Sequence, residues 1–375
     1  MPIDLYQRSI QIILANQGGA GGYLACPNFP TYRYCWFRDG SFIAYAMDLS
    51  GQRDSAARFH QWATGVVLRR ADLVQRAIDK VGRGESLGNE DLLHTRYTLA
   101  GEVSGEEWPN FQLDGFGTWL WALAEHRRMH AARLPEEWLQ AVALVGKYLA
   151  ALWHLPCSDL WEENADQVHP YTLAAIYAGL GAEMTLNGND HTAVLDEIQT
   201  TLLSRGVYEG HFTKSIGSKE VDASLIALSV PYHLVELDHP LMLATIDNIA
   251  SGLRMGGGVH RFRQDTYYGG GEWVLLTAWL GWYYTRSGRK QDAQELLEWV
   301  EACAGENGEL AEQIPHSLND PVSYEPWRQR WGDIAQPLLW SHAMYIILRH
   351  ALKTSGEVIW STQGPKSAKS AKMNL

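Results

Sequence analysis

The chain has 375 residues, of which 46% are hydrophobic and 20% charged. This composition is typical of a globular protein with a large core and excludes a mostly disordered chain. The 43 acidic residues outnumber the 31 basic ones, and the net charge of −12 disfavours nucleic acid as a partner. No apolar run of about 18 residues indicates a membrane span. The N-terminus has no signal-peptide pattern and the four cysteines are widely spaced, so we expect a cytoplasmic protein with free thiols.

Tryptophan is unusually frequent, with 16 residues against 8 phenylalanines. Several tryptophans stand beside charged residues or glycines, as in CWFRDG, LWEEN and EPWRQRWGD. Flat aromatic faces next to polar groups suit sugar rings, which present C–H faces and hydroxyl edges. An aromatic-rich core explains the composition about as well, so composition alone leaves both interpretations open.

Helical patterns run through the chain, and two kinds of helix alternate. The first kind has an apolar stripe and a polar face. We predict these amphipathic helices at 5–17, 55–78, 135–155, 193–204, 241–253 and 293–303. The second kind carries almost no charge, which indicates burial on all sides. We predict that these helices begin near Asp39, Asp114, His169, Asp222, Glu272 and Gln336.

This alternation predicts an all-α fold, an (α/α)6 barrel of six helical hairpins. A solenoid of hairpins is the alternative, although solenoids have a tighter fixed period. We expect a single domain over residues 1–360 and a polar C-terminal tail over 361–375, to which we assign no chemistry. All loops that enter inner helices lie at one end of such a barrel. These loops are rich in Trp, Tyr, Arg and Glu, and we predict that they form one pocket at its mouth.

Two of these loops carry carboxylates of chemical interest. Glu162 and Glu163 follow Trp161 in LWEEN, and an indole beside a carboxyl group desolvates it and raises its pKa, so that it can donate a proton. Glu312, in LAEQIP, lies in the loop before the last inner helix and would face Glu162 across the mouth. Two carboxyl groups roughly 6.5–9.5 Å apart suit hydrolysis of a glycosidic bond with inversion. Taken singly, each motif is explained better by a helix-start or solvent-exposed glutamate.

Two further motifs combine arginine with aspartate. Arg38 and Asp39, in YRYCWFRDG, would bind adjacent hydroxyl groups as a donor fork and an acceptor, or form a buried structural ion pair. Arg261, Asp265 and Tyr267 crowd the Gly-rich segment HRFRQDTYYGGGEW. A turn whose polar groups bind one another is the alternative there.

We expect no cofactor and no metal. The glycines at 18–22 are not followed by a βαβ pattern, which argues against a dinucleotide site. His126 and His130 are four residues apart, but EHRRMH lacks the glutamate of the HExxH zinc motif. We therefore predict a solvent-exposed helix face at this histidine pair.

In order along the chain, the motifs YRYCWFRDG, EEWPNFQLDGFG, DLWEEN, RFRQDTYY, AEQ and PLLWSHA resemble those of glycoside hydrolase family 15, the glucoamylase family. The resemblance extends from about Tyr32 to about His350. It implies that Glu162 is the general acid, that Glu312 is the general base and that Glu163 binds the second sugar. The other substrate-binding residues that it implies are Tyr32, Trp36, Arg38, Asp39, Trp108, Leu160, Trp161, Arg261, Asp265, Tyr267 and Trp340.

The activity that the resemblance implies is that of an inverting, exo-acting α-glucosidase. We expect it to release β-glucose from isomaltose and short isomalto-oligosaccharides, which are joined by α-1,6 links. An α-1,4 substrate, trehalose, a disaccharide phosphorylase and a sugar-binding protein without activity are the alternatives. The expected partners are a small oligosaccharide substrate and a glucose product, with neither nucleic acid nor membrane.

Overall fold

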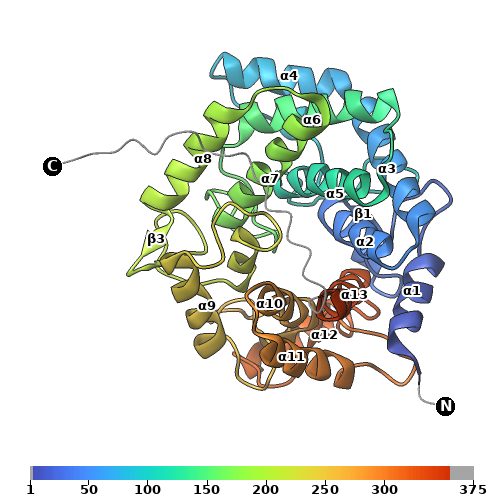
Figure 1. The fold of residues 1–375 in the computed structure, drawn as a ribbon, viewed down its shortest axis with the longest axis vertical. Helices are drawn as coiled ribbons and strands as arrows, with labels where there is room; N and C mark the ends of the chain where they lie inside the picture. Colours follow the sequence, from blue (N-terminus) through green and yellow to red (C-terminus); the bar gives the residue numbers. More distant parts are fainter. Residues whose placement is uncertain (1–2, 355–375) are drawn as a thin grey trace.

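The helices form two concentric rings in the computed structural model, which describes residues 3–354 (Figure 1). Each inner element contacts the next and the last contacts the first, so the ring closes; its members are α2 (Phe37–Leu49), α5 (Asp114–His130), α7 (Pro170–Asn187), the 3-10 helix η3 (Ala223–Leu228), α10 (Val274–Arg286) and α13 (Leu339–Thr354). The outer ring consists of α1 (Leu5–Ala15), α3 (Arg53–Leu68), α4 (Ala71–Gly82), α6 (Glu136–Leu152), α8 (Thr192–Arg205), α9 (Pro240–Gly252) and α11 (Lys290–Ala302). This arrangement is the predicted (α/α)6 barrel. The predicted tail at 361–375 lies outside the described residues.

Close packing of small residues joins neighbouring inner helices. Gly117 of α5 lies directly against α7, where an added β-carbon would collide with the carbonyl group of Ala175. Gly179 of α7 lies in turn against the backbone of Gly117. The two glycines therefore allow the α5 and α7 backbones to approach closely. No helix within residues 3–354 combines the length and apolar character needed to cross a bilayer.

Three details differ from the sequence-based predictions. The predicted helix at 55–78 is two helices, α3 and α4, separated at Arg69 and Arg70. The fourth inner element is the short η3 instead of a full helix, because Pro231 lacks an N–H group and disfavours helical geometry in the residue before it. An unpredicted short helix, α12 (Tyr324–Trp331), lies in the loop before α13.

The histidine pair on α5 is a further correction. His126 is only 2% exposed, and His130 is half-buried, so this face of α5 is not the solvent-exposed surface that the sequence predicted. Both rings turn toward Asp48 of α2, with which they form hydrogen bonds. The burial follows from packing of α5 between its neighbours, which the spacing of the two histidines does not reveal.

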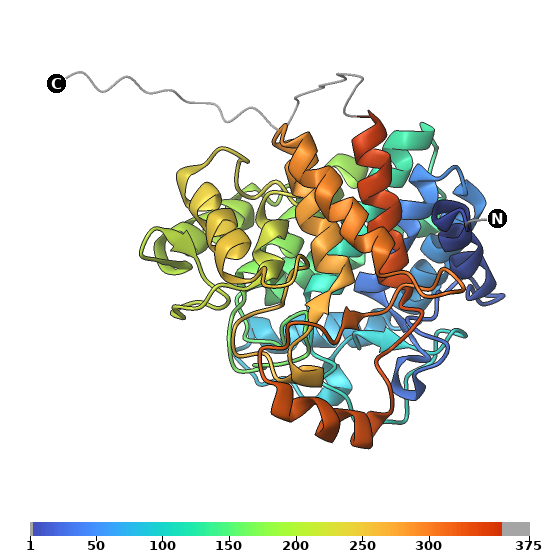
Figure 2. The same ribbon diagram turned by 90° about the horizontal axis from the view of Figure 1, so that it is seen from below.

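Short antiparallel strand pairs tie the loops together at one end of the barrel. Strand β1 (Cys35–Trp36), just before α2, pairs with β2 (Arg96–Tyr97). Strand β5 (Glu272–Trp273), just before α10, pairs with β6 (Gln313–Ile314). Figure 2 shows that α12 and long loop segments gather below the ends of the inner helices. A third pair, β3 (Val207–Tyr208) and β4 (His211–Phe212), is a hairpin after α8.

Candidate active site

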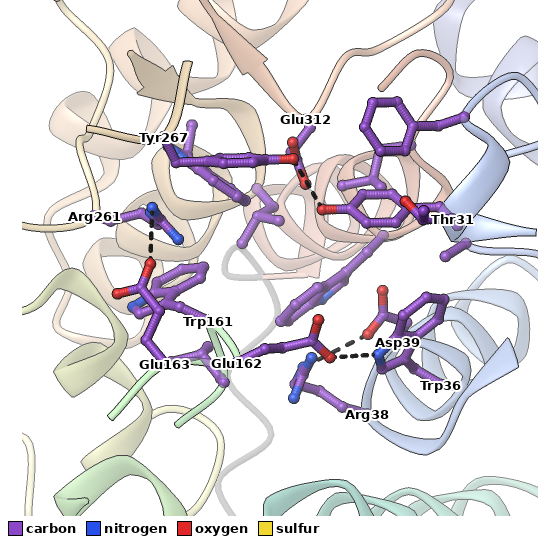
Figure 3. A pocket seen from close by; sticks show the side chains of 18 of the residues that line it. Thr31, Trp36, Arg38, Asp39, Trp161, Glu162, Glu163, Arg261, Tyr267 and Glu312 are labelled. Carbon is purple, nitrogen blue, oxygen red and sulfur yellow. Dashed lines mark hydrogen bonds and ion pairs between the residues drawn. The ribbon is translucent and has the colours of Figure 1, made fainter. Parts of the chain in front are cut away.

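A cavity of ≈ 280 Å³ lies at the loop end of the barrel (Figure 3). Thirteen of the fourteen site residues predicted from the sequence line it, and they come from α2, from α13 and from the loops before α2, α5, α7, α10 and α13. They are Tyr32, Trp36, Arg38, Asp39, Trp108, Leu160, Trp161, Glu162, Glu163, Arg261, Tyr267, Glu312 and Trp340. Segments far apart in sequence thus meet at one pocket, as the barrel topology predicts. The fourteenth residue, Asp265, is buried behind the cavity wall.

Three N–H donors converge on one carboxyl oxygen of Glu162. Its Oε1 accepts hydrogen bonds from Trp36 Nε1 at 2.7 Å and from Trp108 Nε1 at 2.9 Å. Gln112 Nε2 donates the third, at 3.1 Å. An oxygen that accepts three hydrogen bonds has no room for an acidic proton, so a transferable proton must be carried on Oε2. The donors therefore fix the orientation of the carboxyl group and leave Oε2 for chemistry.

The turn that presents Glu162 is built by Asp159. The Oδ1 atom of Asp159 accepts hydrogen bonds from the backbone N–H groups of Trp161 and Glu163, each at 2.9 Å. Glu162 itself has a φ of 69°, in the left-handed region, which costs a non-glycine residue about 1–3 kcal/mol. Sequence reasoning missed Asp159, although an aspartate that opens a short polar segment is a known turn signal.

Gln112 and Arg96, which sequence reasoning also missed, support the Glu162 side of the site. Gln112 accepts a hydrogen bond from Arg38 Nη1 at 2.9 Å and donates to Glu162, so it links two predicted site residues. The guanidinium group of Arg96 lies 3.6 Å from the centre of the Trp108 ring. Gln112 occurs within the quoted motif EEWPNFQLDGFG, whereas Arg96 stands in no motif.

Glu312 faces the cavity from the opposite side (Figure 3). The backbone N–H of Val274 donates to its carbonyl oxygen at 3.2 Å, and its own N–H donates to Ala335 O at 2.9 Å. Burial raises the pKa of Glu312 to about 8, although the hydroxyl groups of Tyr32 and Tyr267 and the charge of Arg261 act in the opposite direction. Its Oε2 atom is buried without a hydrogen-bond partner. Such an oxygen at the wall of a polar cavity is suited to accept a proton from water.

Arg38 and Asp39 lie in the first turn of α2, with their side chains at the cavity (Figure 3). Arg38 Nη1 is 3.0 Å from Asp114 Oδ2, and Arg38 Nε is 3.5 Å from Asp39 Oδ2. Arg38 Nε and Asp39 Oδ2 nevertheless have no hydrogen-bond partner. Burial raises the pKa of Asp39 to about 7, against the lowering effect of Arg38. The buried ion pair considered from the sequence is thus present, with polar capacity left over for a ligand.

Asp265 organises two residues that line the cavity. It accepts a hydrogen bond from Arg261 Nε at 2.7 Å and a second from Arg261 Nη2, and its Oδ1 accepts from the backbone N–H of Tyr267 at 2.9 Å. The Tyr267 hydroxyl lies 3.1 Å from the Tyr32 hydroxyl. Asp265 therefore positions Arg261 and Tyr267, and we interpret its effect on a ligand as indirect.

Glu163 lies beside Glu162 at the cavity wall and is held by two cations. Its Oε1 is 3.5 Å from Arg261 Nη2, and its Oε2 is 3.7 Å from Lys214 Nζ. The side chain is 40% exposed, so it is open to a ligand that extends toward solvent. Lys214 carries no motif signal in the sequence, and its role becomes visible only in the folded chain.

The sequence analysis missed eight further lining residues, most of them apolar. They are Ala25, Phe29, Thr31, Trp273, Leu275, Trp327, Trp331 and Leu338. Trp327 and Trp331 belong to α12, the unpredicted helix, and the Trp327 ring centre lies 5.1 Å from that of Tyr267. The segment EPWRQRWGD contains both tryptophans, so its high tryptophan content was the only sequence signal that these residues could line the pocket.

No lining residue belongs to the group of potential metal ligands identified among residues 3–354. That group, Asp48, His126 and His130, contains none of the residues at the cavity. The titratable groups that line the cavity are the carboxyl groups of Asp39, Glu162, Glu163 and Glu312, the guanidinium groups of Arg38 and Arg261 and the hydroxyl groups of Tyr32 and Tyr267.

Residues 2–297 match the family model of the glycosyl hydrolases family 15. The chain belongs to this family. It is 41% identical to the isomaltose glucohydrolase of Kribbella flavida over 93% of this chain and 92% of that one. It is 27% identical to trehalase 1 of Sulfolobus acidocaldarius over 72% of this chain and 49% of that one. The protein is accordingly a glycoside hydrolase.

Solved structures agree with this family membership. A wild-type glycosidase has a TM-score of 0.90 and 40% identity, with 93% of this chain and 96% of that chain covered. A Glu-to-Ala variant of a glycosidase in complex with glucose gives the same values. A bacterial glucoamylase complexed with acarbose has a TM-score of 0.71 at 20% identity, covering 94% of this chain and 55% of that one, and shows that the fold is shared.

Proposed function

We propose that this glycoside hydrolase is an inverting, exo-acting α-glucosidase that releases β-glucose from isomaltose and short isomalto-oligosaccharides. The observation that carries the proposal is the pairing of two different carboxyl groups in one cavity. Glu162 is fixed by three N–H donors, and Glu312 is buried with an unpartnered oxygen. The 41% identity to an isomaltose glucohydrolase supports the substrate class.

In the proposed reaction, Glu162 acts as general acid. Its Oε2–H protonates the glycosidic oxygen while the bond from that oxygen to C1 breaks. A water molecule attacks C1 from the opposite face, and Glu312 Oε2 accepts the proton that this water loses. The products are β-glucose and the shortened sugar, with Glu162 ionised and Glu312 protonated. Proton exchange with solvent then restores both groups.

Glu312 has to be ionised to act as base. A pKa of about 8 leaves part of the population ionised near neutral pH, and a base is most effective when its pKa is close to the working pH. The hydroxyl groups of Tyr32 and Tyr267 and the positive charge of Arg261 favour the ionised form. These residues therefore oppose the rise in the Glu312 pKa that burial causes, and they help to keep Glu312 ionised, as the reaction requires.

The remaining lining residues fit the two sugars of the substrate. We assign the terminal glucose to Arg38 and Asp39, whose polar atoms are not fully hydrogen-bonded, and to the tryptophans around them. We assign the second glucose to Glu163, which follows the acid and is partly exposed. We also expect the protein in the cytoplasm, which cell fractionation would test.

The decisive test is product analysis by proton NMR on fresh reaction mixtures of isomaltose, maltose, trehalose and dextran. We expect the highest kcat/KM for isomaltose and β-glucose as the first anomer. Initial α-glucose would contradict the assignment of Glu312 as a base. Equal or higher kcat/KM for maltose or trehalose would refute the linkage preference. Turnover that requires inorganic phosphate and yields a sugar phosphate would identify a phosphorylase instead.

A further inference from the structure

Asp48, His126 and His130 form a buried cluster at the barrel end distant from the catalytic cavity. Asp48 lies in the last turn of α2, nine residues after Asp39, which corresponds to about 13 Å along the helix. His126 and His130 lie in the last two turns of α5, whose first turn begins near Arg38 with Asp114. The cluster is therefore separate from the site of hydrolysis, and the proposed reaction uses none of its residues.

The three side chains converge on a common point. His126 Nδ1 is 2.9 Å from both carboxyl oxygens of Asp48. His130 Nε2 is 2.8 Å from Asp48 Oδ1. One ligand atom from each of the three residues lies within 4.8 Å of the other two. Histidines four residues apart lie on one face of a helix, which explains why both reach the same carboxylate.

The donor set has the chemistry of a transition-metal site. Two imidazole nitrogens and one carboxylate are ligands found at zinc sites that keep a fourth position open. The Asp48 side chain is completely buried, and that of His126 is 3% exposed. The His130 side chain is 18% exposed, which gives an ion a route from solvent. A divalent cation bound between the three side chains would compensate the negative charge of the buried carboxylate.

His60, on the neighbouring helix α3, is an independent observation at the same place. Its ring centre lies 5.1 Å from that of His126. It is fully buried, and neither of its nitrogens has a hydrogen-bond partner. A third imidazole without a partner therefore borders the cluster.

We propose that Asp48, His126 and His130 bind one divalent transition-metal ion of the zinc class, which ties helix α2 to helix α5 at the barrel end away from the cavity. This departs from the expectation drawn from the sequence, which foresaw no metal because the HExxH pattern is lacking. In this site the carboxylate comes from a different helix, so a motif within one segment could not reveal it. The ion would stabilise the pairing of two adjacent inner helices and would take no part in hydrolysis.

The test uses the full-length protein without a histidine tag, treated with chelator and then freed of it. Isothermal titration with Zn²⁺ and metal analysis after gel filtration are expected to give one ion per chain. His130→Gln, at a half-buried position near the helix end, should weaken binding at least about tenfold. The matched control is His154→Gln, which removes an exposed histidine outside the cluster and should bind like the wild type. Co²⁺ in place of Zn²⁺ should give visible absorption bands that His130→Gln changes and His154→Gln does not.

Two results would overturn the proposal. The first is a wild-type protein that binds no Zn²⁺, in which case the cluster is a hydrogen-bonded group only. The second is equal affinity in the wild type and in a His130→Gln variant whose circular dichroism shows a folded chain. Neither readout depends on sugar hydrolysis, so failure here is distinguishable from failure of the proposed function.

Discussion

The hydroxyl group of Tyr267 should control the pH at which the enzyme becomes active. In the cavity, the Tyr267 hydroxyl favours the ionised form of Glu312 and lowers its pKa, against the effect of burial. Removing this donor by Tyr267→Phe leaves the ring in place and favours the protonated form. Because Glu312 has to be ionised to accept a proton, the acid limb of kcat/KM should move to higher pH.

The strength of one hydrogen bond to a charged group sets the scale of this shift. Such a bond contributes about 1.5–3 kcal/mol, and one pKa unit corresponds to about 1.4 kcal/mol. The expected displacement is therefore about 1–2 pH units. In the wild type, we expect kcat/KM to fall on the acidic side with an apparent pKa near that of Glu312, which is about 8 and far above the ordinary value of 4.5. The variant should then lose most of its kcat/KM at neutral pH and recover part of it at higher pH.

The assay is kcat/KM for isomaltose across the pH range, since this parameter reports the pKa values of the free enzyme. Tyr268→Phe is the matched control, because the Tyr268 hydroxyl donates to Gly332 O at 2.9 Å and its side chain does not line the cavity. In that variant, the acidic side of the pH profile of kcat/KM should stay at the wild-type position. A Tyr267→Phe variant whose kcat/KM is lower at every pH, with no shift of the profile along the pH axis, would refute the reasoning. Tyr267 would then act only through packing. A wild-type limb at or below about 4.5 would contradict the raised pKa of Glu312 itself.

Three other substitutions test the assigned roles. Glu312→Gln should lower kcat by a factor of roughly 10² to 10⁴ on every substrate, measured by glucose release. The control Glu306→Gln, at an exposed position, should leave kcat unchanged. A Glu312→Gln variant with activity near wild type would exclude Glu312 as the base. Glu162→Gln should impair isomaltose hydrolysis far more than that of an aryl α-glucoside, because a good leaving group needs less protonation; equal losses in kcat would mean that Glu162 is not the acid. Glu163→Ala should narrow the ratio of kcat/KM for isomaltose and maltose while the inhibition constant of glucose stays the same, and an unchanged ratio would exclude contact with the second sugar.

The sequence was sufficient to predict the barrel because a buried helix has a clear pattern in the sequence: it carries almost no charge. Helices without charge, such as α7 and α10, must be covered on all sides, and their alternation with amphipathic helices leaves few architectures. The prediction of a full helix as the fourth inner element was wrong for a local reason. Its apolar pattern is that of a buried helix, but Pro231 within that segment excludes continuation, and the chain forms η3 and turns instead.

The site was predictable as far as its motifs reach. Glu162, Glu312 and the residues beside them stand in segments with a recognisable order, and they line one cavity. Some of the groups that support them do not stand in such segments. Arg96 contacts Trp108 and Lys214 contacts Glu163 through tertiary packing, so neither had a pattern to be found by.

The same distinction explains why the two glutamates differ although their residue type is identical. Glu162 gains three N–H donors from Trp36, Trp108 and Gln112, which come from the loops before α2 and α5. Glu312 is enclosed by aromatic residues that include Tyr32 and Tyr267, and burial outweighs the lowering effect of their hydroxyl groups in setting its pKa. Motifs therefore identified which carboxyl groups meet and which of them is acid or base, whereas the contacts that orient Glu162 and enclose Glu312 depend on neighbours that only the closed barrel brings together.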